Sequence, residues 1–185
     1  AACVQQARPE QLLDVGCNTG EFSFLALDAG AKHVVGLESD HQALSSAYAQ
    51  AVEKQANFLP LHQNITNPSP SQGWAYEERE SIGQRVSADF VLALAILHHI
   101  VISGNVPLRR ALSYLVALAP RGVIEWVPKS DPMVQTLLRN REDIFESYSD
   151  TVLEQTLAQE GAKIVKKQTL ENGRVLYLYE KHGAA

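Results

Sequence analysis

A glycine-bounded turn follows the first apolar run of the chain and has the sequence Asp14-Val15-Gly16-Cys17-Asn18-Thr19-Gly20. Its glycines allow the backbone to pass close beneath a ligand. The backbone N–H groups near Thr19 and Gly20 point out of the start of the next expected helix, toward an anion. Glu38 ends the second apolar run, and a carboxylate there can accept both hydroxyls of a ribose. These residues raise the question of which ligand approaches the turn: a phosphate, a nicotinamide dinucleotide or another molecule.

Two common glycine-rich sites do not fit this turn. A phosphate-binding P-loop needs a Gly-Lys-Ser/Thr sequence, and none follows the turn. A nicotinamide dinucleotide site needs G-x-G-x-x-G, but aligned positions hold Gly16, Asn18 and Glu21, so two of the three glycines are missing. A nicotinamide-dependent oxidoreductase is therefore disfavoured. A turn that serves only tight packing remains the structural alternative, which Glu38 at the neighbouring strand end makes weaker.

The turn resembles the first motif of class I S-adenosylmethionine-dependent methyltransferases, D/E-x-G-x-G-x-G, with Asn18 in place of the middle glycine. Asparagine tolerates left-handed backbone angles better than most residues. The resemblance covers residues 11–181 and implies that the turn binds the methionine carboxylate, that Asp14 lies beside the methionine ammonium and that Glu38 holds the ribose. It also implies that Asn64 contacts the adenine edge. The cofactor residues expected on this basis are Asp14, Gly16, Cys17, Asn18, Thr19, Gly20, Glu38, Ser39, Asn64, Ile65, Ala93 and Leu94.

Two adjacent histidines, His98 and His99, follow the fourth apolar run in the stretch ILHHI. Imidazole titrates near neutral pH, so either ring could act as a general base on a methyl acceptor. Neighbouring side chains on a helix point about 100° apart, so we expect the two rings to diverge and to make a poor metal pair. We therefore predict no metal. In the structural alternative, one histidine packs or caps and the other lines the cofactor cleft.

Glu125 is a carboxylate near the end of the otherwise apolar fifth strand. Ligands of open α/β sheets bind at the carboxyl ends of strands, and a buried carboxylate needs a partner, which we expect to be Lys129 or Arg139. In the functional interpretation, Glu125 is a third catalytic candidate and joins Lys129 and Asp131 around a polar substrate. In the structural one, Glu125 forms an ion pair and Asp131 caps the next helix.

A mixed-charge segment, residues 140–149, lies where related enzymes build substrate lids, and we include its Arg141 among the substrate residues. Such a segment is otherwise a solvated face. The stretches GWAYEERES, LALAILHHI and VIEWVPKSDPMVQTLL also resemble a bacterial group of methyltransferase-like proteins, some of them nodulation-related.

Apolar runs alternate with helical patterns along the chain, which indicates an α/β, Rossmann-like, doubly wound sheet. Asn172-Gly173 predicts a terminal hairpin and hence one reversed strand in a mostly parallel, seven-stranded sheet. Pro60 places the third strand near an edge. We expect strands over residues 11–16, 33–38, 57–64, 88–96, 122–128, 163–170 and 174–181, and helices over residues 21–29, 40–55, 74–85, 106–118, 133–141 and 151–159.

The chain has 185 residues, which fits one methyltransferase domain, with or without the N-terminal cap helices that related enzymes carry. Its net charge of −5 gives no global attraction for nucleic acid or an anionic membrane. Its two cysteines show no disulfide spacing, so we expect a reduced, cytoplasmic protein. The expected activity is methyl transfer from S-adenosylmethionine to a small molecule or protein side chain. The fourth strand lacks the Asn/Asp-Pro-Pro-Tyr/Phe and Pro-Cys sequences of adenine, glutamine and cytosine methylation. The alternative is a non-catalytic module that binds S-adenosylmethionine.

Overall fold

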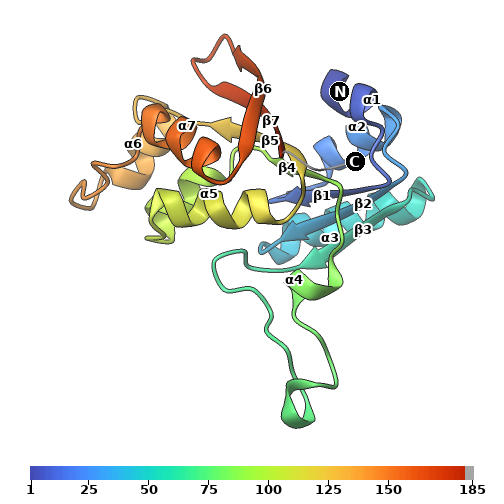
Figure 1. Ribbon diagram of the computed structural model, residues 1–185. Helices are drawn as coiled ribbons and strands as arrows, with labels where there is room; N and C mark the ends of the chain where they lie inside the picture. The colour runs from blue at the N-terminus through green and yellow to red at the C-terminus, as the bar shows by residue number, and fades with distance from the viewer. Residues whose placement is uncertain (182–185) are drawn as a thin grey trace. The chain divides into compact units, whose positions relative to one another are not determined.

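The computed structural model describes residues 1–181, and seven strands form one mixed sheet in the order β3-β2-β1-β4-β5-β7-β6 (Figure 1). β1 runs parallel to β2 and β4, and β2 runs parallel to β3, whereas β7 runs antiparallel to both β5 and β6. This confirms the expected α/β sheet with one reversed strand. The strands are β1 (Gln11–Val15), β2 (His33–Glu38), β3 (Phe58–His62), β4 (Phe90–Ala93), β5 (Arg121–Trp126), β6 (Ala162–Thr169) and β7 (Val175–Lys181).

The chain divides into two compact units, Ala1–Leu92 and Ala93–Ala185. In the first unit, β1 is buried from Leu12 to Val15, as a strand with helices on both faces should be. Pro60 is tolerated in β3 because this strand lies at the edge of the sheet, as predicted. The helices of this unit are α1 (Ala2–Ala7), α2 (Glu21–Asp28), α3 (His41–Glu53), the 3-10 helix η1 (Trp74–Tyr76) and α4 (Ile82–Arg85).

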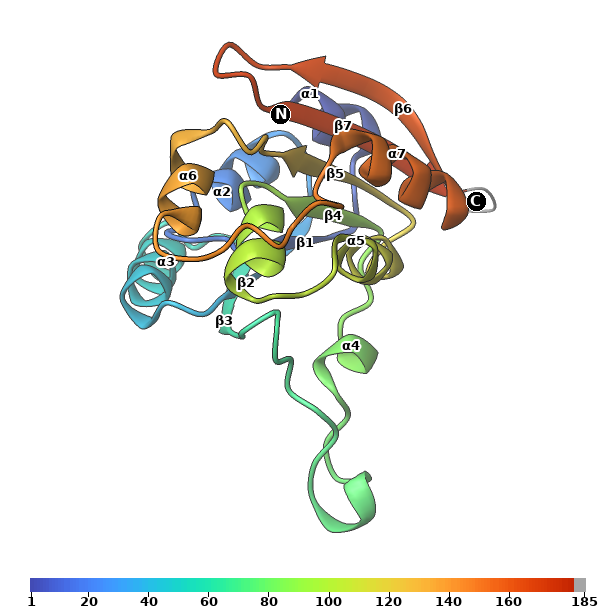
Figure 2. The same ribbon diagram turned by 90° about the vertical axis from the view of Figure 1, so that its left-hand side faces the viewer.

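The connection from β3 to β4, residues 63–89, extends away from the strands of its unit as an arm (Figures 1 and 2). The expected single helix over residues 74–85 is wrong. Ala75 and Tyr76 have left-handed backbone angles, with φ of 54° and 62°, which an α-helix of L-residues does not accommodate. A separate capping box at Ser81 starts α4. The polar segment offers no apolar stripe to bury, so nothing stabilises one continuous helix.

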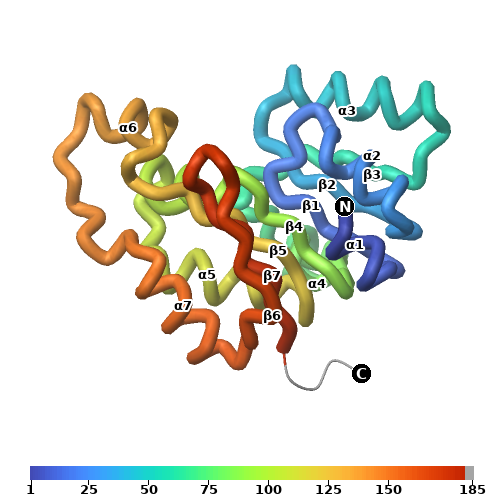
Figure 3. Tube along the Cα trace, turned by 90° about the horizontal axis from the view of Figure 1, so that it is seen from above, coloured from blue at the N-terminus to red at the C-terminus, as the bar shows by residue number. Residues whose placement is uncertain are grey.

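The second unit contains the π-helix η2 (His99–Ser103) and the helices α5 (Leu108–Ala117), α6 (Pro132–Leu138) and α7 (Asp150–Gln159). α5 buries Leu108, Ala111, Leu112, Leu115 and Val116, the spacing of an amphipathic helix. Figure 3 shows the β6–β7 hairpin with α7 beside it. Gly173 adopts a φ of 79° in the hairpin turn, which confirms that predicted turn, and Gly161 adopts a φ of 70° where α7 ends.

β4 is shorter than expected, because Ala95 has a φ of 49° and takes the chain out of the sheet after Ala93. The fifth strand and the helix after it also begin one residue earlier than expected and end two and three residues earlier, respectively. Among residues 1–181, no helix combines the length and the apolar character that a membrane span requires.

Candidate cofactor and acceptor sites

The glycine turn is held against the end of β2 by two backbone hydrogen bonds. The N–H groups of Gly16 and Cys17 both donate to the carbonyl oxygen of Leu37, at 2.8 and 3.1 Å. Gly16, Asn18 and Gly20 have φ values of 78°, 50° and 87°, so Asn18 adopts the left-handed conformation that a glycine would adopt there. The turn therefore keeps the backbone path that its sequence predicts, in spite of the replaced glycine.

Gly20 is also required for packing. It precedes the first turn of α2, and a Cβ atom there would lie 2.6 Å from the ring of Phe58 and 3.2 Å from the ring of Phe24. Any larger residue would push α2 away from β3. This glycine therefore serves close approach within the fold as well as the path of the turn.

Glu38 lies at the end of β2 and bonds to the glycine turn. Its Oε2 accepts from the N–H of Asn18 at 2.8 Å, while its Oε1 accepts from the N–H groups of Ser39 and Asp40 at 2.7 and 2.9 Å. A carboxylate oxygen has two acceptor sites, so Oε2 retains one for a further donor. The side chain is thus fixed beside the turn, as a ribose acceptor must be.

A surface hollow of about 460 Å³ opens beside Glu38. Thr19 in this hollow is tied to α3, because its carbonyl oxygen accepts from Gln50 Nε2 at 3.2 Å. Polar and apolar surface share the lining, so the hollow can meet both the polar groups and the carbon skeleton of a ligand. The hollow is lined by Asn18, Thr19, Glu38, Asp40, Gln42, Ala43 and Ser46.

Asp14, at the end of β1, is a buried acid. Ser23 Oγ donates to its Oδ2 at 2.6 Å. Burial raises the pKa of Asp14 to about 6, the Ser23 hydrogen bond opposes this shift, and repulsion from Glu38 adds to it. A buried carboxyl group with so little compensation gains strongly from a nearby cation, which is the role the resemblance implies.

Cys17 and Ser39 occupy different surroundings. The Cys17 side chain is buried, and a Cβ atom on Gly36 would lie 2.6 Å from its Sγ, so this thiol packs into the core against β2. Ser39 is exposed, and it contributes its backbone N–H to Glu38. Only the backbone of Cys17 remains in the expected cofactor role.

Asn64 and Ile65 lie at the start of the arm, just beyond β3. The Oδ1 of Asn64 accepts from both the N–H and the hydroxyl of Thr66, at 2.9 and 2.7 Å. This oxygen is therefore already used to close a turn. An adenine contact by Asn64 would have to come from its Nδ2, which can donate to a ring nitrogen. Ile65 is half-buried in the same turn.

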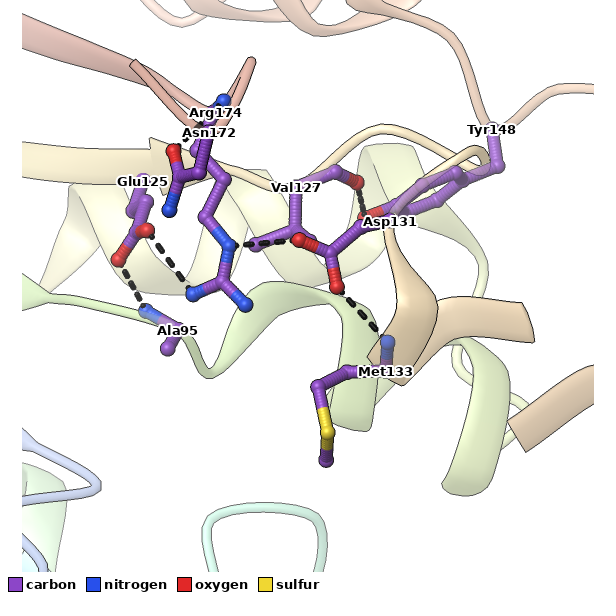
Figure 4. A network of polar contacts seen from close by, with 8 residues as sticks. All are labelled: Ala95, Glu125, Val127, Asp131, Met133, Tyr148, Asn172 and Arg174. Atoms are coloured by element: carbon purple, nitrogen blue, oxygen red, sulfur yellow. Dashed lines mark hydrogen bonds and ion pairs between the residues drawn. The ribbon is translucent and has the colours of Figure 1, made fainter. Parts of the chain in front are cut away.

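In the second unit, a buried polar cluster surrounds the end of β5 (Figure 4). Glu125 Oε2 accepts from the N–H of Ala95 at 2.8 Å, and its Oε1 pairs with Arg174 Nη1 at 3.3 Å. Arg174 Nε also donates to Asp131 Oδ2 at 2.8 Å. Ala93 ends β4 and is fully buried, and Leu94 follows it and is half-buried.

The expected partner of Glu125 is wrong, because Arg174 takes that place and neither Lys129 nor Arg139 does. Arg174 follows the hairpin turn of Asn172 and Gly173, and the sequence carries no signal that connects it with β5. Asp131 caps α6, since its Oδ1 accepts from the N–H of Met133 at 2.8 Å. Both structural alternatives named for Glu125 and Asp131 are therefore observed.

The other two expected substrate residues are engaged as well. Lys129 Nζ forms a partly exposed ion pair with Asp143 at 2.7 Å. Arg141 donates to the carbonyl oxygen of Ile102 and to Asn105 Oδ1, and its guanidinium lies 5.1 Å from the centre of the Phe145 ring. Arg141 thus ties the segment before α7 to the end of η2.

His98 is buried, and none of residues 1–181 forms a hydrogen bond with its Nδ1. Burial lowers its pKa to about 4, with smaller contributions from His99 and Arg174.

The expectation that His98 and His99 point apart is wrong, because their ring centres lie 4.2 Å apart. His98 has α-helical backbone angles, and the π-helix η2 begins at His99. No metal-binding group of three ligand side chains occurs within residues 1–181.

The sequence is similar to a nodulation protein, although no family model matches it. The chain is 43% identical over 182 residues to nodulation protein NoeA of Rhizobium meliloti, and this match covers 98% of the chain but 38% of NoeA. The chain therefore spans about two fifths of the length of that relative. A 59-residue stretch, 29% of the chain and 20% of the relative, is 37% identical to the ribosomal protein L11 methyltransferase of Shewanella baltica.

Solved structures agree on the fold. Magnesium protoporphyrin IX methyltransferase from Synechocystis PCC 6803, crystallised with bound S-adenosylmethionine, superimposes with a TM-score of 0.67 and 18% identity, over 97% of this chain and 75% of that enzyme. At this low sequence identity, the superposition shows that the two proteins share a fold. The chain is a relative of NoeA that has the fold of class I S-adenosylmethionine-dependent methyltransferases.

Proposed function

We propose that the chain binds S-adenosylmethionine and transfers its methyl group. The observation that carries this proposal is the hydrogen bond between Glu38 Oε2 and the N–H of Asn18, at 2.8 Å. This bond joins Glu38, which we propose as the ribose acceptor, to the glycine turn, which we propose as the site of the methionine carboxylate. Both Glu38 and Asn18 of the turn line one hollow of about 460 Å³. A side chain of Glu38 turned away from that turn would have contradicted the assignment.

The buried Asp14 supports the same ligand. Its pKa of about 6 reflects the cost of burying the charge, and an ammonium group beside it would offset that cost. The ligand that fits these residues has a carboxylate for the glycine turn, an ammonium for Asp14 and a ribose for Glu38. The bound S-adenosylmethionine of the Synechocystis enzyme is such a ligand.

The reaction is an in-line displacement. The bond between the methyl carbon and the sulfonium sulfur breaks, its electron pair stays on sulfur, and the methyl carbon bonds to a lone pair of the acceptor. The acceptor proton then leaves to a base or to water. The cofactor supplies the reactivity, and the protein contributes orientation, which is worth about 7–11 kcal/mol in well-aligned systems.

The proposed acceptor is a small molecule or a protein side chain. His98 is neutral near pH 7, because its pKa is about 4. Its enclosed Nδ1 makes it a poorer base than its sequence position implies.

Isothermal titration with S-adenosylmethionine tests the cofactor, with NADH as the comparison ligand. We expect binding of the first and not of the second. Glu38→Gln keeps the size of the side chain but removes its charge, and we expect it to weaken binding by about tenfold or more. Unchanged affinity in this variant would contradict the ribose role of Glu38.

The alternative function is a module that binds S-adenosylmethionine without turnover. It draws support from Glu125 and Asp131, both of which already take part in ion pairs, and from the capping of α6 by Asp131. A screen for the demethylated cofactor across amines, alcohols and peptides separates the two. Product formation that Glu38→Gln abolishes supports the enzyme, and tight binding without product supports the module.

A further inference from the structure

Two histidines outside the expected cofactor residues stack beside Glu38. His41 begins α3 and His62 ends β3. Their ring centres lie 4.0 Å apart with an angle of 5° between the planes. In the sheet, His62 lies opposite Glu38 in the parallel register of β2 and β3. Both rings are exposed, so their stacking is not a consequence of core packing.

His62 bonds to the turn that follows Glu38. Its Nε2 lies 3.1 Å from the carbonyl oxygen of Ser39. A carbonyl oxygen can only accept, so the hydrogen bond requires a proton on Nε2. The stacked ring of His41 restricts the rotation of the His62 ring and keeps its Nε2 directed at this carbonyl.

The peptide unit between Ser39 and Asp40 is held at both ends. Its carbonyl oxygen accepts from His62, and its N–H, that of Asp40, donates to Glu38 Oε1 at 2.9 Å. Hydrogen bonding to a peptide oxygen polarises the unit and strengthens its N–H as a donor. His62 therefore acts on Glu38 through one rigid peptide plane.

The contacts continue from Glu38 to the glycine turn. Glu38 Oε2 accepts from the N–H of Asn18, so the polar chain runs from His62 through the Ser39–Asp40 peptide and Glu38 to the turn. Asp40 is independently anchored, because its Oδ1 accepts from the N–H groups of Gln42 and Ala43 at the start of α3. The relay thus rests on a fixed helix end.

We propose that His62, supported by His41, is a positioning residue for the cofactor: it orients the Glu38 carboxylate toward the ribose through the Ser39–Asp40 peptide. This inference rests on the proposed binding of S-adenosylmethionine. Neither His62 nor His41 is one of the residues that we propose to contact the cofactor. The hydrogen bonds from His62 to Glu38 would fix the direction in which the unused acceptor site of Glu38 Oε2 points.

Titration with S-adenosylmethionine tests the relay with three variants of the whole chain. We expect His62→Leu, which removes the donor, to weaken binding by about three- to tenfold. His62→Gln keeps an N–H donor near the Nε2 position, and we expect affinity within about twofold of the natural chain. The matched control is His33→Gln, because His33 is an exposed histidine at the opposite end of β2, and we expect no change.

A double-variant cycle identifies the route of the effect. If His62 acts through Glu38, His62→Leu should have almost no further effect in a Glu38→Gln background. Equal losses in both backgrounds, or a His62→Gln variant as weak as His62→Leu, would overturn the proposal. Circular dichroism on each variant checks that it is folded.

A measurement without cofactor separates this proposal from the proposed function. Amide hydrogen exchange reports on the Asp40 N–H directly. We expect His62→Leu to speed its exchange and His62→Gln to leave it slow. Absence of S-adenosylmethionine binding together with this exchange pattern would reject the cofactor and retain the relay; equal exchange in all variants would reject the relay.

Discussion

Arg174 Nε donates to Asp131 Oδ2 at 2.8 Å, although 43 residues separate the two in sequence. The same guanidinium pairs with Glu125 at 3.3 Å. One side chain from the β6–β7 turn therefore connects β5 and the start of α6 (Figure 4). Through Glu125 it also stabilises the left-handed Ala95, two residues beyond the end of β4.

Replacement of Arg174 by alanine should destabilise the chain strongly. Glu125 and Asp131 are 7% and 6% exposed, and removal of one partner of a buried pair costs about 3–5 kcal/mol. Urea denaturation measures the loss. Arg110→Ala, at an exposed position of α5, is the matched control, with an expected change within about 0.5 kcal/mol. Equal free energies of unfolding in the two variants would show that the ion pairs of Arg174 do not stabilise the fold.

The Asp14→Asn variant should show a pH-dependent gain in stability. The folded pKa of about 6 lies above the ordinary value of 3.8, so the charged form is disfavoured in the fold. The natural chain therefore loses up to about 3 kcal/mol as the pH rises from about 4 through about 6. Asparagine carries no charge and escapes this loss.

Urea unfolding of both chains between pH 4 and 7.5 measures the difference, in which all other titrating groups cancel. The advantage of Asp14→Asn should grow as the pH rises through about 6. Asp28→Asn, at an exposed carboxylate at the end of α2, should show no such growth. A constant difference across the range would show that Asp14 is not a buried, disfavoured charge.

The two cysteines should differ in reactivity. Burial, with repulsion from Asp14 and Glu38, raises the pKa of Cys17 to about 12, so almost no thiolate forms at pH 8. Cys3 is half-buried. We expect a thiol reagent to modify Cys3 in the folded chain and both cysteines after denaturation. Mass spectrometry of the labelled peptides gives the sites, and fast labelling of Cys17 in the folded state would refute its packing against Gly36.

The tip of the arm should contribute little to stability. Trp74 is 85% exposed and Trp126 is 6% exposed. Trp74→Phe should therefore change the free energy of unfolding by less than about 0.5 kcal/mol and should remove most of the fluorescence that acrylamide quenches. Trp126→Phe, which disturbs a stack on Tyr148 at 4.3 Å, should leave that quenching intact but lower stability. Strong destabilisation by Trp74→Phe would place the tip in a packed environment.

Much of the fold follows from local patterns. Alternating apolar runs and helical segments predicted the mixed sheet, and Asn172-Gly173 predicted the hairpin, because turn chemistry and side-chain periodicity act over a few residues. The prediction of one helix over residues 74–85 was wrong. The polar sequence there has no apolar face to bury, and Tyr76 has left-handed backbone angles that interrupt a helix. The bond from Glu38 to Asn18 follows from the order of β1 and β2, which the pattern also predicted.

The sequence by itself determined the glycine turn and the carboxylate at the end of β2, and it predicted that the first two strand ends are neighbours, since turn chemistry is local and consecutive parallel strands usually lie side by side. Only the tertiary structure decided that Arg174 is the partner of Glu125, that His62 holds the Ser39 carbonyl and that the rings of His98 and His99 lie together. The first two contacts depend on packing between elements far apart in sequence. The third depends on the side-chain directions of two adjacent residues, which the packing around the start of η2 sets.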